Sequence, residues 1–81
     1  MVKLKNIKRN GKIISCDYYP ESTDLKGYIA VDIDKKTFID YVESTFDGGF
    51  APATYARYAK MRLLDIADDN PLPKETVAMW Y

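Results

Sequence analysis

The sequence predicts an α+β fold: a mainly antiparallel sheet of three to five strands with one main helix packed on one face. Apolar and polar residues alternate in two regions, as they do in half-buried strands. One region surrounds Asn10-Gly11, and the other runs from Gly27 to Asp34. A third segment, from about residue 52 to 69, has apolar residues at helical spacing. Strands that come first, followed by one helix, are typical of this class. A chain of 81 residues has room for one core, so we expect residues 1–81 to form a single domain.

Residues 2–9 and 12–19 are predicted to form a β-hairpin. Asn10 and Gly11 both tolerate positive φ, which a type I′ turn needs at its two central positions. The apolar positions of this hairpin are Ile14, Cys16 and Tyr18 after the turn, and Val2, Leu4 and Ile7 before it. The second set alternates less regularly, which indicates a bulge or an exposed edge.

The segment from Pro20 to Lys26 is predicted to be a loop, because proline cannot donate to a strand ladder and turn-forming residues follow it. Gly27 then opens a strand over 27–34. Its two faces are Ile29, Val31 and Ile33 on one side, and Tyr28, Ala30, Asp32 and Asp34 on the other.

Residues 35–46 fit two structures. Phe38, Tyr41, Val42 and Phe46 have helical spacing, with Asp34 as the N-cap. The same stretch also fits the two faces of a strand, with a hairpin turn over 34–37. The pattern favours the strand, because the preceding strand ends at a turn-like Asp-Lys-Lys sequence.

The predicted helix begins near Pro52, whose missing N–H is tolerated at a first helical position. Its small residues Ala56 and Ala59 allow close approach to a sheet, and the proline-containing segment 70–73 ends it. Residues 76–81 are expected to form a last strand or a docked tail. The predicted core residues are Leu4, Ile14, Cys16, Tyr18, Ile29, Val31, Ile33, Ala56, Ala59, Leu63 and Ile66.

The residue types argue against familiar catalytic chemistry. The chain has no histidine and one cysteine, which excludes Ser-His-Asp and Cys-His nucleophile systems and the usual zinc sites. No glycine-rich phosphate loop occurs. We therefore expect a non-enzymatic protein with no catalytic residues, cofactor or metal. One cysteine, no signal-peptide run and no long apolar segment favour a cytoplasmic protein without a membrane partner.

Two chemical candidates have simpler structural explanations. Asp32 and Asp34 lie two residues apart and could share a cation or acid–base work, but a solvated polar face beside a turn accounts for them. Cys16 could be a reactive thiol, but its position between Ile14 and Tyr18 indicates a small core residue. The structural explanation is favoured for both.

Charge is unevenly distributed, although the formal net charge is zero. The first twelve residues carry five positive charges and no acid, whereas residues 13–50 carry eight acids against three lysines. The basic residues predicted to contact nucleic acid are Lys3, Lys5, Lys8, Arg9 and Lys12, with Tyr18, Tyr19 and Tyr28 as stacking platforms. A lysine-rich edge strand that discourages aggregation is the alternative, and the zero net charge favours it.

A second candidate surface follows the helix and the end of the chain. Tyrosine, methionine and arginine are enriched in interfaces. The predicted protein-interface residues are Tyr55, Tyr58, Met61, Arg62, Trp80 and Tyr81. The alternative is that these side chains cover the core of a small sheet. The sequence thus favours a protein-interaction module that binds a protein partner or itself, with a single-stranded nucleic-acid binder as the alternative.

Three strings resemble parts of short uncharacterised proteins of Gram-positive bacteria. They are Gly27-Tyr-Ile-Ala-Val-Asp32-Ile-Asp34, Tyr55-Ala-Arg-Tyr-Ala59 and Pro71-Leu-Pro-Lys-Glu-Thr-Val-Ala-Met-Trp80-Tyr81. The resemblance implies a small bacterial cytoplasmic protein. It attaches no activity, ligand or site residue to this chain.

Overall fold

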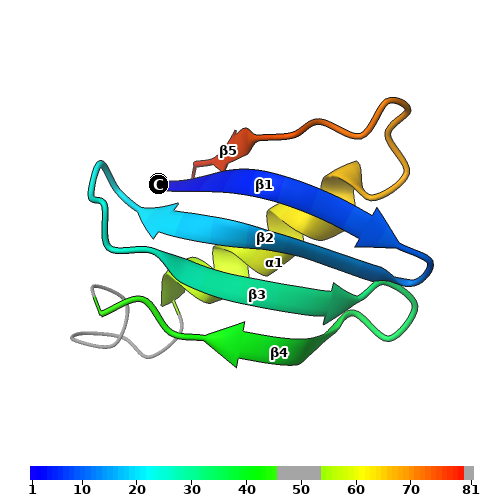
Figure 1. Cartoon of the computed structure of the whole chain (residues 1–81), viewed down its shortest axis with the longest axis horizontal. Helices are drawn as coiled ribbons and strands as arrows, with labels where there is room; N and C mark the ends of the chain where they lie inside the picture. The colour runs from blue at the N-terminus through cyan, green and yellow to red at the C-terminus, as the bar shows by residue number, and fades with distance from the viewer. Residues whose placement is uncertain (46–53, 80–81) are drawn as a thin grey trace.

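The computed structural model describes residues 1–45 and 54–79. Its elements are β1 (Val2–Asn10), β2 (Ile13–Pro20), β3 (Gly27–Asp32), β4 (Thr37–Val42), α1 (Thr54–Ile66) and β5 (Thr76–Ala78). The strands form one sheet in the order β4-β3-β2-β1-β5, and every neighbouring pair is antiparallel. Helix α1 crosses one face of this sheet (Figure 1). The predicted α+β class, with one helix on a mainly antiparallel sheet, is confirmed.

The core lies between the sheet and the helix. The residues that form it are Val2, Leu4, Ile7, Ile14, Cys16, Tyr18, Ile29, Val31, Ala56, Ala59, Leu63, Ile66, Ala67 and Ala78. Every predicted core residue is buried except Ile33, which is half-buried. The strand prediction over 27–34 ran two residues too far: β3 ends at Asp32, so Ile33 lies in the turn and only packs against the edge of the core.

The first hairpin turns one residue later than predicted. Asn10 pairs with Ile13, so Gly11 and Lys12 occupy the central positions of the turn. Gly11 has φ +62°, and Lys12 is not among the positive-φ residues. A positive φ at the first central position alone is the pattern of a type II′ turn, so the predicted type I′ turn centred on Asn10-Gly11 is wrong. The observed pairing of residue 10 with 13, in place of 9 with 12, leaves each side chain on the face predicted for it. The turn then needs positive φ at Gly11 alone.

The irregular alternation in β1 is a β-bulge, one of the two explanations that the sequence left open. Lys5 pairs with Asp17 and Lys8 with Ser15, so Asn6 and Ile7 share one position opposite β2. Asn6 adopts φ +55°, a conformation that asparagine tolerates better than most residues. The extra residue restores Ile7 to the helix side of the sheet, where it is buried.

Residues 37–42 form β4, which confirms the strand interpretation of the ambiguous segment. Its register with β3 also shifts once, so Ile39 is an extra residue and both Phe38 and Tyr41 pack against the core. The described helix runs from Thr54 to Ile66, shorter than predicted at its C-terminal end, and the predicted start at Pro52 lies outside the described residues. The sequence predicts a last strand or a docked tail for residues 76–81, and residues 76–78 form a strand, β5, which pairs with the start of β1.

Candidate interaction surface

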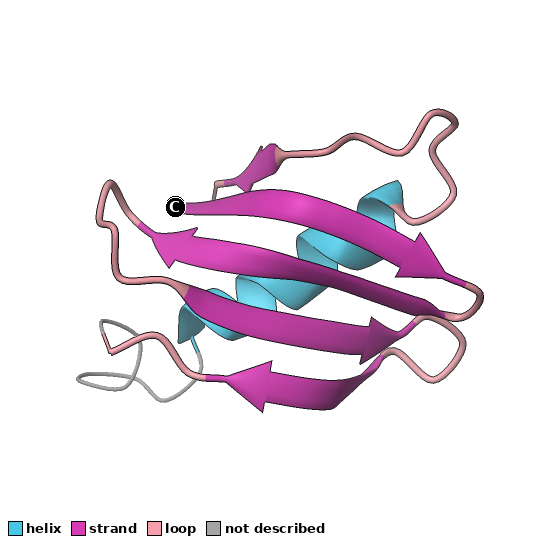
Figure 2. Ribbon diagram, viewed as in Figure 1, coloured by secondary structure: helices cyan, strands magenta, loops and turns pink. Residues whose placement is uncertain are grey.

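In the part of the chain that the structure describes, helix α1 covers one face of the sheet and the other face, called here the open face, is uncovered. In Figure 2 the sheet lies in front of the helix, and no described segment crosses its near side. Burial along β2 shows the division: Ile14, Cys16 and Tyr18 are buried toward the helix, whereas the residues between them are not. Directly opposite residues of antiparallel strands point to the same face. The residues of β1, β3 and β4 that pair with the open-face residues of β2, or with one another in the same row, therefore lie on the open face as well.

The open face consists of short rows that run across the strands. From β1 toward β4, the rows are Lys3–Tyr19, Lys5–Asp17–Tyr28–Val42, Lys8–Ser15–Ala30–Asp40 and Asn10–Ile13–Asp32–Thr37. Val77 of β5 extends the first row beyond Lys3. The surface therefore combines aromatic, aliphatic and charged side chains on one continuous sheet.

The charges on this face are separated by strand. β1 contributes three lysines, Lys3, Lys5 and Lys8, whereas β3 and β4 contribute Asp32 and Asp40. β1 and β4 lie three strand spacings apart, roughly 14 Å. The open face is thus basic toward one edge and acidic toward the other.

Asp17 stands in the middle of the open face and has local partners. Its Oδ2 accepts a hydrogen bond from Asn6 Nδ2 at 2.8 Å, and Lys26 Nζ lies 4.0 Å from the same oxygen. The bulge therefore has a second role, because it points the Asn6 amide at this carboxylate. A carboxylate that is hydrogen-bonded and paired tolerates being covered far better than a bare one.

The aromatic part of the open face comes from β2 and β3. Lys5 Nζ lies 5.4 Å from the centre of the Tyr19 ring, a cation–π contact. Tyr28 lies one strand away, next to Val42, whose side chain is 58% exposed. Tyr18, which the sequence also suggested as a stacking platform, is buried in the core, where its hydroxyl oxygen accepts a hydrogen bond from Ser44 N at 2.9 Å.

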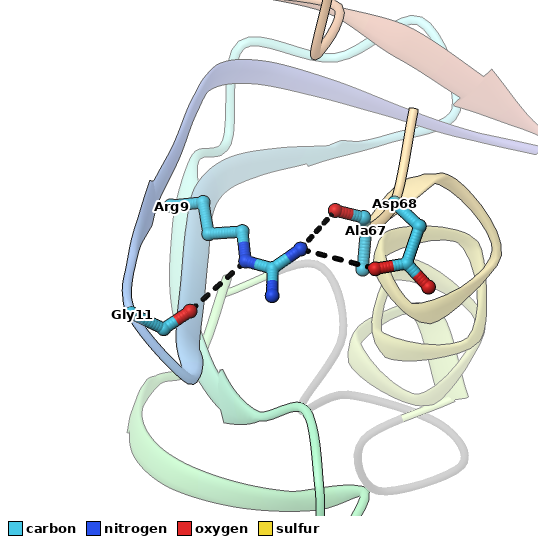
Figure 3. Close-up of polar contacts among 4 residues, drawn as sticks. All are labelled: Arg9, Gly11, Ala67 and Asp68. Atoms are coloured by element: carbon cyan, nitrogen blue, oxygen red, sulfur yellow. Dashed lines mark hydrogen bonds and ion pairs between the residues drawn. The ribbon is translucent and has the colours of Figure 1, made fainter. Parts of the chain in front are cut away.

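The structure divides the five basic residues predicted to contact nucleic acid. Lys3, Lys5 and Lys8 share the open face, but Arg9 points the other way, toward the helix. Arg9 Nη1 donates to the carbonyl of Ala67 at 2.5 Å and lies 3.2 Å from Asp68 Oδ1, and Nε donates to the carbonyl of Gly11 at 2.9 Å (Figure 3). Arg9 thus joins the β1–β2 turn to the C-terminal end of α1, where cations are favoured.

Lys12 is also engaged within the chain. Its Nζ lies 2.9 Å from Asp34 Oδ2, and this carboxylate raises the pKa of Lys12 through a hydrogen bond and charge attraction. Asp32 Oδ1 accepts a hydrogen bond from Lys35 N at 3.0 Å and so closes the β3–β4 turn. Asp32 and Asp34 therefore have separate structural partners.

Cys16 is fully buried beneath the helix. Burial, with a smaller contribution from the charge of Asp17, raises the pKa of its thiol to about 12. The thiolate needed for nucleophilic or redox chemistry is therefore scarce at neutral pH. Among residues 1–45 and 54–79, the cysteine, aspartate and glutamate side chains form no group of three that could hold a metal ion.

Three of the predicted interface residues line one shallow groove between α1 and β5. Tyr58, Met61 and Arg62 line it together with Ala78 and Met79, and its volume is about 210 Å³. Tyr58 also packs against the core, and Arg62 Nε and Nη2 donate to Thr76 Oγ1 at 3.2 and 3.1 Å, which ties the helix to β5. Met61 is the most exposed of the three, at 56%.

Tyr55, another of the predicted interface residues, does not line this groove. Tyr55 packs against the core. A hydrogen bond from the N-terminal ammonium lowers the pKa of Glu21, and a hydrogen bond from Tyr55 lowers it further. Trp80 and Tyr81 lie outside the described residues. The assignment of an interface to this set therefore stays a prediction.

Sequence reasoning did not identify the open face as a site. The signal was present in the alternation of residues 28–32 and 37–42, but only the pairing of the strands shows that Tyr28, Asp40 and Val42 share a surface with the lysines of β1.

Comparison with protein families, with curated proteins and with solved structures finds no match for this chain. No helix in the described parts of the chain has the length and apolar character that a membrane span requires. The site must therefore be interpreted from its own geometry.

Proposed function

We propose that this chain is a non-enzymatic protein-interaction module that binds through the open face of its sheet. The single observation that supports this is the composition of that face: Tyr28 and Val42 lie at its centre and edge, with lysines on one side and aspartates on the other. Aromatic anchors surrounded by charged groups of both signs are typical of protein interfaces, in which charge sets orientation.

The face is favoured over the sheet edge as the binding element. β4 is an edge strand, but it carries a bulge at Ile39, and the carboxylate of Asp40 accepts a hydrogen bond from Tyr41 N at 2.8 Å. Bulges and charged side chains on an edge strand disfavour addition of a further strand. A partner is therefore expected to pack on the side chains rather than to extend the ladder.

The experiment compares three immobilised baits in a lysate and against the purified chain itself. The baits are wild type, Tyr28→Thr and the matched control Met61→Asp on the helix side. Threonine suits a strand, so Tyr28→Thr removes the ring with little effect on the fold. We expect wild type and Met61→Asp to retain the same protein and Tyr28→Thr to lose it. Loss with Met61→Asp alone would assign the interface to the α1–β5 groove, and no specific capture by any bait would remove the proposal.

A single-stranded nucleic-acid binder is the second candidate, because Lys3, Lys5, Tyr19 and Tyr28 share the open face. Lysines that track a backbone beside rings that stack on bases are the usual elements of such sites. Asp17, Asp32 and Asp40 on the same face repel phosphate, which favours the protein partner. Binding of a labelled oligonucleotide at low salt, weakened steeply by added salt and by Tyr28→Thr, would support this alternative. No binding at low salt would exclude it.

A further inference from the structure

We propose that the partner of the open face is a second copy of this chain. This inference rests on the proposed function and specifies it. The two sheets would pack face to face about a two-fold axis that runs parallel to the strands and passes over the gap between β2 and β3. That rotation places β1 of one copy over β4 of the other, and β2 over β3.

The argument begins with the row Lys8–Ser15–Ala30–Asp40. It has a basic residue at one end, two small residues in the middle and an acidic residue at the other end. A two-fold axis between its two small residues puts each Lys8 over Asp40 of the second copy. The same pair forms twice, and Ser15 over Ala30 leaves room for the two sheets to approach.

Lys8 and Asp40 are available for such a contact. Both side chains are exposed, and Lys8 has no ion-pair partner among residues 1–45 and 54–79. The hydrogen bond from Tyr41 N occupies Oδ1 of Asp40, which leaves Oδ2 for a cation. Within one chain the two residues lie at opposite ends of the row, roughly 14 Å apart, so they do not neutralise one another.

The neighbouring row fits the same arrangement. In Lys5–Asp17–Tyr28–Val42, the rotation places Tyr28 over Asp17 of the other copy, and the Lys5 stem over Val42. The Tyr28 hydroxyl can donate to Asp17, whose charge already has Asn6 and Lys26 beside it. The other in-plane two-fold axis, perpendicular to the strands, would instead place the lysines of β1 over each other, which is repulsive.

The size of the face indicates how strong this contact is. Four strand widths and the length of β1 give on the order of 500 Å² per copy, or roughly 1,000 Å² in total. This is at the lower limit of specific interfaces. We therefore expect a weak, concentration-dependent dimer rather than an obligate one.

Sedimentation equilibrium from low micromolar to millimolar protein tests the proposal with Lys8→Glu, Asp40→Lys and the double variant. Each single variant faces like charges twice in its own dimer, so its dissociation constant should rise at least about tenfold. A mixture of the two single variants restores both attractive pairs, as does the double variant. The mixture should form a heterodimer close to wild type in affinity. Lys60→Glu on the helix serves as the charge-change control.

The outcomes separate this inference from the proposed function. The two-fold arrangement would be overturned if both single variants dimerised with the same dissociation constant as wild type. It would also be overturned if the two single variants failed to associate when mixed. A wild-type monomer at every concentration would overturn self-association. In that case, capture of another protein that Tyr28→Thr abolishes would leave the proposed function standing, and its absence would remove both.

Discussion

Gly27 lies directly against the ring of Tyr18: a Cβ atom at Gly27 would be 2.2 Å from Cε1 of that ring. The two residues are paired across β2 and β3, so the ring occupies the space that any other residue at 27 would need. The hydroxyl of the same ring accepts the hydrogen bond from Ser44 N. Gly27 thus allows Tyr18 to reach from the core to the segment that follows β4.

Gly27→Ala should destabilise the protein by about 1–3 kcal/mol, the usual cost of overpacking a core. The new methyl group would force the Tyr18 ring to move and would weaken its bond to Ser44. Urea unfolding followed by circular dichroism measures the change. In a Tyr18→Leu background, which removes the ring, Gly27→Ala should cost clearly less; equal costs in both backgrounds would contradict the steric explanation.

Asn6 should be replaceable by glycine but not by a β-branched residue. Its φ of +55° suits glycine, so Asn6→Gly loses only the side-chain bond to Asp17 and should change stability by about 1 kcal/mol or less. Asn6→Val combines that loss with left-handed backbone strain and should cost about 2 kcal/mol or more. Thermal unfolding of both variants tests this, and equal stability would show that the bulge does not constrain residue 6.

Arg9→Ala should destabilise the protein by about 1–3 kcal/mol, because it removes a guanidinium that holds the end of α1 to the first hairpin. The exposed Asp68 contributes little, with its side chain 95% exposed, so Asp68→Asn should be nearly neutral. The control is Lys8→Ala on the open face, expected within about 0.5 kcal/mol of wild type when both are monomeric. Urea unfolding at low protein concentration measures all three. A harmless Arg9→Ala would contradict the capping role.

Cys16 should resist thiol reagents in the folded state. The fully buried thiol, with a pKa of about 12, presents almost no accessible thiolate at pH 8. A chromogenic disulfide reagent should therefore react at least about a hundredfold more slowly with the native protein than with the protein in denaturant. A native rate close to the denatured one would show that the thiol is open to solvent.

The raised pKa of the Cys16 thiol should make the protein less stable at alkaline pH. The pKa of this thiol is 9.0 when unperturbed and about 12 in the folded protein, so between these values the unfolded chain releases a proton that the folded chain retains. The contribution of the Cys16 thiol to the free energy of unfolding is therefore complete below pH 9. It is lost as the pH rises toward 12, by up to about 1.4 kcal/mol for each pH unit. Cys16→Val should lose less stability than wild type over this range, as measured by urea unfolding at several pH values. Parallel curves would contradict the assignment.

Local alternation predicts part of the open face, whereas the rest depends on the register between strands. The three lysines of β1 and the alternation of Tyr28 with Ile29 were visible in the sequence, since a local period of two assigns residues to faces. That Asp40 and Val42 lie on the same surface depends on register. The register of β4 changes at Ile39, and no local pattern indicates where a bulge lies.

The sequence by itself determined the fold class, the presence of the first hairpin and most of the core, because local alternation and helical spacing indicate which side chains must be buried. Only the tertiary structure decided that Arg9 turns toward the helix while Lys8 faces solvent, and that Gly27 must make room for Tyr18. Those outcomes depend on contacts between residues far apart in the chain: Ala67 meets Arg9 only once α1 lies across the sheet. Partners of that kind are set by packing, which local periodicity does not encode.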